Sequence, residues 1–407
     1  MLIGVLAGYS RVGRRASDLM PHIRPVQPVP TAPSARRPSG PQLKGEMAEN
    51  VAIVLSTGPQ RQHYDSRRTH RAMARGPKVA KLSWRHPVGG AIQGQVVTDY
   101  DEQRLFVASL NGLLTALDRR GNEVFVVELG GRAYGAPCVD RDGTIFVGSD
   151  ARKLYAISAQ GAVLWTLDTL GEADTGPVID QLGRVLFAAG RSLFAVRPRG
   201  DVVFRFEAGG KIFSSPAVRT DGSIVFGAQD HFAYRISQDG QLLGKADLEF
   251  DCDGSPAITD HGDTCFGTDG GEIVCLDEDW RVRTRVSVGG YVRGPLSIAR
   301  NGDVFAGVYG PNPRQVRVNI NTSMVRGSHY VRGTSAREFG VHGGATEDAI
   351  GNLYFGAQDD AIYGIDTNGD ISFYYQTEGD VDAPITILSD GSLVAGSDDG
   401  YVYSFQP

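Results

Sequence analysis

Polar residues that could bind a ligand recur in seven short segments between residues 130 and 384. The segments read "GGRAYGAP", "LGEADTGP", "GGKIFSSP", "EFDCDGSP", "GGYVRGP", "EFGVHGG" and "EGDVDAP". Their candidates for a shared binding site are Tyr134, Asp174, Asp251, Asp253, Arg293, His342, Asp380 and Asp382, and the same segments carry Arg132, Lys211 and Tyr291. Carboxylates that converge on a narrow opening create a negative potential, which attracts a cation or a basic peptide. The alternative interpretation is that these side chains only line a water-filled hole.

The four cysteines offer a second kind of chemistry. Cys265 and Cys275 flank the turn in "CFGTDGGEIVC", so they can face each other across a hairpin. A cross-strand disulfide is one interpretation, but we favour the other, in which both are small buried apolar residues. Cys138 and Cys252 stand far apart, and neither CxxC nor HxxxH occurs, so the sequence predicts no zinc site.

Motifs for catalysis are missing from the sequence. It contains no nucleophile elbow in a strand–turn–helix context and no phosphate-binding loop, so we predict no catalytic residue and no enzyme activity. Turns such as "GSDAR", "GTDGG" and "GSDDG" are rich in Asp because Asp and Gly adopt the backbone conformations of tight hairpins. Calcium binding is the alternative for these turns, although none has the ligand order of an EF-hand.

An internal repeat shows which elements position these segments. A phrase of apolar residues, a small residue and a polar turn recurs eight times, as in "TIFVGSDAR" and "SIVFGAQDH". The small residue falls at Ala108, Gly148, Ala188, Gly227, Gly267, Gly307, Gly356 and Gly396, in steps of 40, 40, 39, 40, 40, 49 and 40 residues. Each repeat holds four short alternating runs separated by Gly, Asp or Asn turns, which is typical of a four-stranded antiparallel sheet. Units of this length and kind predict an all-β fold, an eight-bladed β-propeller.

The ends of the chain predict how the ring closes. The last repeat stops after its third strand, and the missing fourth strand matches "KLSWRHPVGG" around Trp84. We therefore expect this N-terminal strand to complete the blade that holds the C-terminus, which leaves no open sheet edge. The predicted domain is residues 81–407.

Residues 1–80 differ in composition from the rest. They carry 13 Lys and Arg against 4 Asp and Glu, a net charge of +9, and are rich in proline. Such a stretch buries too little apolar surface to offset its chain entropy, so we predict a disordered basic tail. Its opening "MLIGVLAGYS" lacks a preceding basic residue and is short for a signal peptide, and Met47 is an alternative start.

Several phrases resemble a known family. "SSPAVRTDGSIVFGAQD", "GAPCVDRDGTIFVGSDARKLYAIS" and the strands around Trp84 and Trp165 resemble the quinoprotein-like, or PQQ-repeat, propellers over residues 81–407. That family includes alcohol dehydrogenases that hold pyrroloquinoline quinone, a bacterial scaffold lipoprotein of outer-membrane assembly, and sensor domains. The resemblance implies an extracytoplasmic location, with the cytoplasm as the alternative.

The sequence departs from the enzymes of that family at two features. Those enzymes place a disulfide of two adjacent cysteines over the quinone and stack the quinone on an axial Trp. Here no two cysteines are adjacent, and no Trp stands in an inner-strand segment. We therefore expect neither the quinone nor another cofactor, and we expect a scaffold rather than a dehydrogenase.

The function we predict is a non-enzymatic scaffold that binds a protein or peptide through its loop faces. The alternative is an enzyme with an axial site, either quinone-dependent or a propeller hydrolase or lyase. The net charge of −6 argues against nucleic acid as a partner. The sequence contains no run of 18 apolar residues, so we predict no membrane span. One connection, residues 308–343, is about ten residues longer than the others and carries Arg314, Arg317, Arg326, Arg332 and Arg337. It is either an added functional element or a tolerated loop extension.

Overall fold

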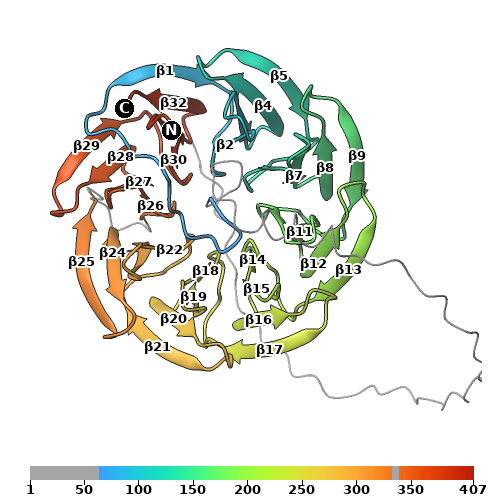
Figure 1. The fold of residues 1–407 in the computed structure, drawn as a ribbon, viewed down its shortest axis with the longest axis vertical. Helices are drawn as coiled ribbons and strands as arrows, with labels where there is room; N and C mark the ends of the chain where they lie inside the picture. Colours follow the sequence, from blue (N-terminus) through green and yellow to red (C-terminus); the bar gives the residue numbers. More distant parts are fainter. Residues whose placement is uncertain (1–63, 311, 332–338) are drawn as a thin grey trace, which may run out of the picture. The chain divides into compact units, whose positions relative to one another are not determined.

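Eight four-stranded antiparallel sheets form the ring that the sequence predicted (Figure 1). A computed structural model describes residues 64–310, 312–331 and 339–407, and all of its regular elements in these residues are strands. No described segment forms a helix of the length and hydropathy that a membrane span needs. We number the blades 1 to 8 in the order in which their inner strands follow along the chain.

Each blade runs from a two-residue strand at the axis to a longer strand at the rim. The innermost strands of blades 1 to 8 are β2 (Val97–Thr98), β6 (Cys138–Val139), β10 (Val178–Ile179), β14 (Ala217–Val218), β18 (Ala257–Ile258), β22 (Ser297–Ile298), β26 (Thr346–Glu347) and β30 (Thr386–Ile387). The second strands are β3 (Arg104–Ala108), β7 (Ile145–Ser149), β11 (Val185–Ala189), β15 (Ile224–Gly227), β19 (Thr264–Gly267), β23 (Val304–Val308), β27 (Leu353–Ala357) and β31 (Leu393–Gly396). The third strands are β4 (Leu113–Asp118), β8 (Lys153–Ile157), β12 (Ser192–Val196), β16 (Phe232–Ile236), β20 (Glu272–Leu276), β24 (Arg314–Asn319), β28 (Ala361–Ile365) and β32 (Tyr401–Phe405). The outer strands are β5 (Glu123–Glu128), β9 (Val163–Asp168), β13 (Val202–Glu207), β17 (Leu242–Asp247), β21 (Val282–Ser287), β25 (Met324–Tyr330), β29 (Ile371–Gln376) and, in blade 8, β1 (Leu82–Pro87).

The apolar phrase of each repeat forms the second strand, and its small residue has a packing role. In blade 2 the strand β7 is buried along its whole length. A Cβ on Gly148 would lie 2.3 Å from the carbonyl oxygen of Ala173, in the segment that leads into blade 3. The same close approach recurs at Gly307, where a Cβ would lie 2.0 Å from the carbonyl oxygen of Val341. Because each blade presses on its neighbour at this point, the position accepts only small residues.

The predicted ring closure is confirmed. β1 pairs antiparallel with β32, with Arg85 opposite Tyr403, so the N-terminal strand completes the blade that holds the C-terminus (Figure 1). Trp84 on β1 reaches across to blade 1, where its indole Nε1 donates a hydrogen bond of 3.0 Å to the carbonyl oxygen of Arg119. The ring therefore closes through this sheet, and Trp84 joins the sheet to blade 1.

Residues 64–77, which we call the plug segment, lie inside the ring rather than in a tail. Figure 1 shows the start of the described chain, in blue, crossing the centre. Carbonyl oxygens of the segment accept hydrogen bonds from inner-strand N–H groups of four successive blades, for example Ser66 from Val218 at 2.8 Å and His70 from Glu347 at 2.9 Å. Tyr64 at its start and Arg68 in its middle are almost fully buried.

This arrangement corrects the predicted boundary at residue 81 for the part that the structure describes. The plug segment was assigned to the tail because it has no apolar period. A segment that runs across the blades, making about one backbone hydrogen bond per blade, needs no such period. Residues 1–63, which hold the rest of the predicted tail, lie outside the described residues.

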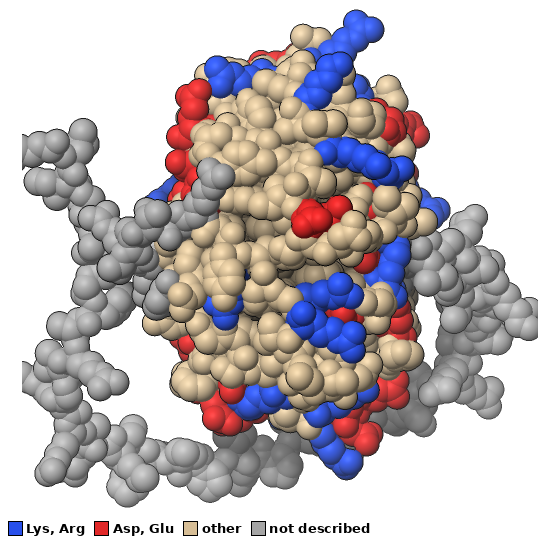
Figure 2. Space-filling model, turned by 90° about the vertical axis from the view of Figure 1, so that its left-hand side faces the viewer, with Lys and Arg blue, Asp and Glu red and all other residues tan. Residues whose placement is uncertain are grey.

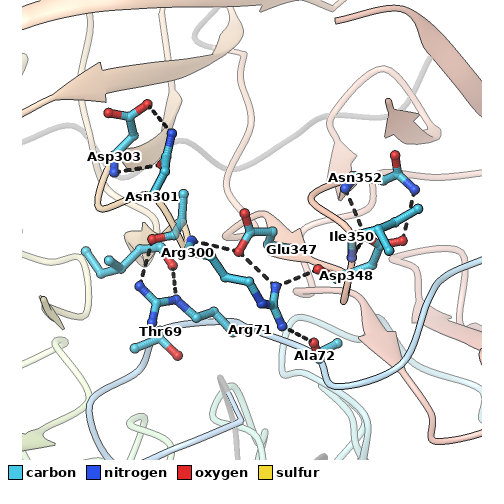
Figure 3. Close-up of polar contacts among 12 residues, drawn as sticks. Thr69, Arg71, Ala72, Arg300, Asn301, Asp303, Glu347, Asp348, Ile350 and Asn352 are labelled. Atoms are coloured by element: carbon cyan, nitrogen blue, oxygen red, sulfur yellow. Dashed lines mark hydrogen bonds and ion pairs between the residues drawn. The ribbon is translucent and has the colours of Figure 1, made fainter. Parts of the chain in front are cut away.

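Arginine side chains fasten the plug segment to blades 6 and 7 (Figure 3). Arg71 donates from Nε to the carbonyl oxygen of Ile298 at 2.8 Å and from Nη2 to that of Ala299 at 2.7 Å. Arg300 of blade 6 donates to the carboxylate of Glu347 at 2.9 Å and also to the carbonyl oxygen of Ala72. The segment is thus held by side chains as well as by its backbone.

The long arginine-bearing connection consists mainly of two ordinary strands. β24 and β25 are the third and fourth strands of blade 6, and they contain Arg314, Arg317 and Arg326. Most of the extra residues therefore fall between β25 and β26. Arg332 and Arg337 lie outside the described residues.

Cys265 and Cys275 form a disulfide, so the interpretation we favoured for them, two small apolar thiols, is wrong. They stand directly opposite each other on β19 and β20, with their Cα atoms 4.0 Å apart. Adjacent strands bring opposite side chains within bonding distance. Cys138, on β6 of blade 2, and Cys252, in the segment that leads into blade 5, are buried thiols.

We expect protein purified without reductant to show two reactive thiols in denaturant, and four after reduction. A thiol-reactive dye and mass spectrometry would count them. Reduction should lower the free energy of unfolding by about 3 kcal/mol, because the bond closes a short loop in the unfolded chain. Four reactive thiols without reduction would contradict the disulfide.

Candidate functional site

One residue from each blade points toward the axis from the same place in the repeat. The eight residues, which we call the axial ring, are Gln93, Tyr134, Asp174, Phe213, Asp253, Arg293, His342 and Asp382. The residue just before each is apolar and fully or almost fully buried between blades, as Ala173 and Val381 are. Because successive side chains of an extended segment point to opposite sides, burial of one directs the next to the axis. All eight line a single cavity of about 550 Å³, the axial mouth.

The axial mouth contains six of the eight candidate residues from the sequence. Asp251 and Asp380 do not line it. They stand two positions earlier in their segments, farther from the axis, where Asp251 lies 3.2 Å from His231 Nε2. Sequence reasoning missed Gln93 and Phe213, although their positions in the repeat match those of the charged members.

At several junctions, a side chain from the turn after the second strand forms a hydrogen bond with the ring residue of the next blade. Arg293 donates from Nε and Nη2 to the two carboxylate oxygens of Asp269, each at 2.9 Å. Gln229 donates to Asp253 at 3.3 Å. The guanidinium charge is therefore balanced by a bidentate carboxylate, while Asp253 receives only a neutral donor.

The same support continues across the closure of the ring. Gln358 donates from Nε2 to both carboxylate oxygens of Asp382, at 3.0 and 3.2 Å. Gln93, from the start of blade 1, donates to Asp398 of blade 8 at 3.3 Å. The axial ring is thus continuous through the junction of the two chain ends.

Burial and mutual repulsion keep several of these carboxyl groups protonated at unusually high pH. Burial, together with the neighbouring Asp150, raises the pKa of Asp174 to about 7. Burial and the charge of Asp269 raise the pKa of Asp253 to about 6. Lys211 Nζ, 3.7 Å from Asp174, offsets part of this effect. A cation that enters the mouth would favour the ionised forms and release protons.

A second acidic group lies where blades 7 and 8 meet. Burial, followed by the charge of Asp382, raises the pKa of Asp380 to about 7 and that of Asp398 to about 6. Carboxylates crowded in this way cannot all ionise without a counter-charge. In the described residues no three or more His, Cys, Asp or Glu side chains are arranged to hold a metal ion.

The plug segment lies beneath the axial mouth. Arg68 donates from Nε to the carbonyl oxygen of Pro216 at 2.7 Å and from Nη2 to that of Gly176 at 3.2 Å, and Gly176 lines the cavity. Burial lowers the pKa of Arg68 to about 9, so the side chain keeps its charge at neutral pH. The mouth lies on the face of the ring where each outer strand connects to the innermost strand of the next blade. The plug segment crosses the innermost strands at their opposite ends.

Comparisons with known proteins agree with the architecture. Residues 72–223 match the family model described as outer membrane protein assembly factor BamB. The crystal structure of BamB from Moraxella catarrhalis superposes with a TM-score of 0.64 at 16% identity, covering 81% of this chain and 100% of that one. The fold is that of the PQQ-repeat propellers.

Two enzymes share this PQQ-repeat propeller fold. A europium-containing methanol dehydrogenase matches with a TM-score of 0.70 at 11% identity, over 87% of this chain and 92% of that one. A quinohemoprotein alcohol dehydrogenase from Comamonas testosteroni matches with a TM-score of 0.70 at 12% identity, over 89% and 84%. No curated protein sequence matches the chain.

The charges of the axial mouth bear on whether it could hold an anionic group such as pyrroloquinoline quinone. Pyrroloquinoline quinone is a polycarboxylate, whereas the axial ring carries three Asp side chains. Its arginine, Arg293, is already engaged by Asp269. An anionic cofactor would therefore meet like charge with little compensation.

Proposed function

We propose that this protein is a non-enzymatic binding platform whose axial mouth engages a basic segment of a protein partner. The observation that carries the proposal is the axial ring, in which carboxyl groups with raised pKa values line one cavity. Tyr134 and Phe213 add aromatic faces on which a Lys or Arg side chain packs well. The match to a family described as an outer membrane assembly factor also favours a protein partner.

We also propose a location for the protein and the absence of a cofactor. We propose an extracytoplasmic protein, supported by the family description and by the disulfide, since disulfides persist in oxidising compartments. We propose that it works without quinone, metal or other cofactor. An enzyme with an axial site is the second candidate, favoured by the fold of the two dehydrogenases.

Replacing Asp253 and Asp382 together by Asn should weaken the binding of a hexaarginine peptide by about tenfold at low salt. The loss is electrostatic, so the variant should also show a flatter salt dependence. Isothermal calorimetry on the full chain would measure both. As a matched control, Asp142→Asn with Asp279→Asn removes the same charge from exposed turns and should change little.

Acidity should modulate the same interaction. Binding should strengthen as pH rises from 5 to 8, because Asp253 and Asp174 ionise near pH 6 and 7. Stability without ligand should change in the opposite sense. A carboxyl whose folded pKa is raised above 3.8 favours the fold fully below about pH 4, and this contribution is lost as pH rises through 6 to 7.

Unchanged affinity of the double Asn variant would mean that the mouth is only a solvated hole.

A further inference from the structure

At five junctions of this ring, an aromatic side chain fills the gap between two neighbouring blades. We call the side chain that fills such a gap the wedge. In blade 2, Trp165 on the outer strand β9 packs over Gly200 in the last turn of blade 3, where a Cβ would lie 3.3 Å from the indole ring. Its Nε1 donates a hydrogen bond of 2.8 Å to the carbonyl oxygen of Pro198 in that turn. The pairs of this kind are Trp84 with Gly121, Phe125 with Gly161, Trp165 with Gly200, and Phe204 with Gly240.

Where the outer strand lacks the aromatic residue, another side chain replaces it. Between blades 4 and 5 the strand residue is Gly244, and Trp280 occupies the turn position instead, with a positive φ of 65°. A Cβ on Gly244 would lie 2.8 Å from the Trp280 ring. Between blades 5 and 6, the hydroxyl groups of Thr284 and Ser323 share a hydrogen bond. The wedge is thus conserved although the residue that supplies it changes.

The junction between blades 6 and 7 has glycine on both sides. Gly327 on β25 stands opposite Arg317, the register position that Trp165 occupies on β9. Its counterpart in the next turn is Gly369. A Cβ on Gly327 would meet nothing within 4 Å, and one on Gly369 would meet only His329, at 3.7 Å.

A cavity of about 720 Å³, which we call the interblade slot, opens at this junction. Both glycines line it, and Phe305, Leu353 and Ile365 contribute apolar walls. Thr367, two residues before Gly369, also lines the slot and corresponds to Pro198, whose carbonyl oxygen accepts the indole N–H in blade 3. The slot therefore has the walls and the acceptor position that hold an indole elsewhere in the ring.

The charges that line the interblade slot are nearly balanced, because Glu347 and Asp366 stand among its arginines and the Asp366 carboxylate accepts hydrogen bonds within its own turn. Arg300, Arg317 and Arg326 line it, and Arg300 and Arg317 are balanced by Glu347 and Asp303. Arg326 forms no hydrogen bond or ion pair with another described residue and is exposed. The adjoining surface is apolar, with Met324 61% and Ile350 49% exposed. Figure 2 faces the side of the ring with β25 and β29, where basic and acidic groups are both scattered over broad uncharged surface.

We infer that the interblade slot binds a tryptophan side chain of a protein partner, presented in an acidic segment. Aromatic side chains fill five of the other junctions, and Trp is among the residues most enriched at the energetic centres of protein interfaces. Acidic neighbours of that Trp would pair with Arg326. The site is separate from the axial mouth, because the turns around it join the strand ends on the opposite face of the ring. It goes beyond the proposed function and does not depend on it.

The experiment uses the full chain and an acetylated Asp-Trp-Glu amide peptide labelled with 5-fluorotryptophan, followed by fluorine NMR. We expect saturable binding to the unmodified protein. Gly327→Trp should fill the slot from within, keep or raise the melting temperature, and weaken peptide binding at least tenfold. Leu243→Trp, on the exposed outer strand of blade 4, adds the same side chain elsewhere and should leave binding unchanged.

A charge-reversal variant keeps the test independent of any packing change. Arg326→Glu should weaken the acidic peptide and strengthen a Lys-Trp-Lys peptide. The inference is overturned if the unmodified protein does not bind the acidic peptide, or if the Gly327→Trp variant binds it with unchanged affinity. It is overturned also if binding appears only after Tyr9→Ala, since Tyr9 is the sole aromatic residue among residues 1–63 and the slot would then belong to the chain itself.

Discussion

A chain that begins at residue 91 is expected to be recovered as aggregate rather than as a soluble monomer. It lacks β1, so the edge of β32 loses its partner from Leu82 to Pro87, and the contact of Trp84 with blade 1 disappears. An unpaired edge exposes a row of N–H and C=O groups that pair with other chains. Size-exclusion chromatography of the soluble fraction would measure the effect.

The matched control is a chain that begins at residue 79. It keeps β1 but loses the plug segment, so it should stay soluble and melt at a lower temperature, because the inner-strand donors on Val218, Ile258, Ile298 and Glu347 lose their acceptors. If both truncated chains were equally soluble and melted alike, β1 would not be what closes the ring.

Arg68→Met should cost about 3 to 5 kcal/mol of unfolding free energy, the largest loss we expect from a single substitution. The guanidinium group donates to the buried carbonyl oxygens of Pro216 and Gly176, and methionine offers neither of them a donor. A buried acceptor without a donor costs roughly 1 to 3 kcal/mol, and both carbonyls would be affected. Urea unfolding followed by tryptophan fluorescence would measure the change.

Arg67→Met is the matched control in the same segment. Arg67 lies at the surface and forms an ion pair with Asp260, 27% and 48% exposed respectively, so its loss should cost no more than about 1 kcal/mol. Equal losses for the two variants would show that the plug segment is held by its backbone alone.

Repeat spacing was sufficient to predict the propeller, because each repeat encodes the same local physics. Alternating apolar and polar residues form the strands. The small residue of each repeat, such as Gly148, marks the point where the backbone that leads into the next blade approaches closely. The position of Trp84 in the repeat likewise predicted β1 as the missing strand. These features depend on neighbours a fixed number of residues away, so a single sequence reveals them.

The members of the axial mouth were only partly predictable. Charge singled out Asp174 and Asp253 but also Asp251, which does not line the mouth and lies beside His231 of blade 4. Phe213 carries no charge and was overlooked. Position in the repeat, rather than residue type, decides which side chain reaches the axis, and an alignment of the eight repeats would have found every member.

Periodicity in the sequence thus determined by itself the all-β fold, the number of blades and the closing strand. Only the tertiary structure decided the path of the plug segment, the Cys265–Cys275 bond and the interblade slot. The plug segment touches each blade once and so leaves no period, and the disulfide depends on strand register. The slot exists because Gly327 and Gly369, 42 residues apart, face the same gap. Neither glycine by itself predicts a cavity. Only the packing of the two blades shows that neither of them places a side chain in the gap.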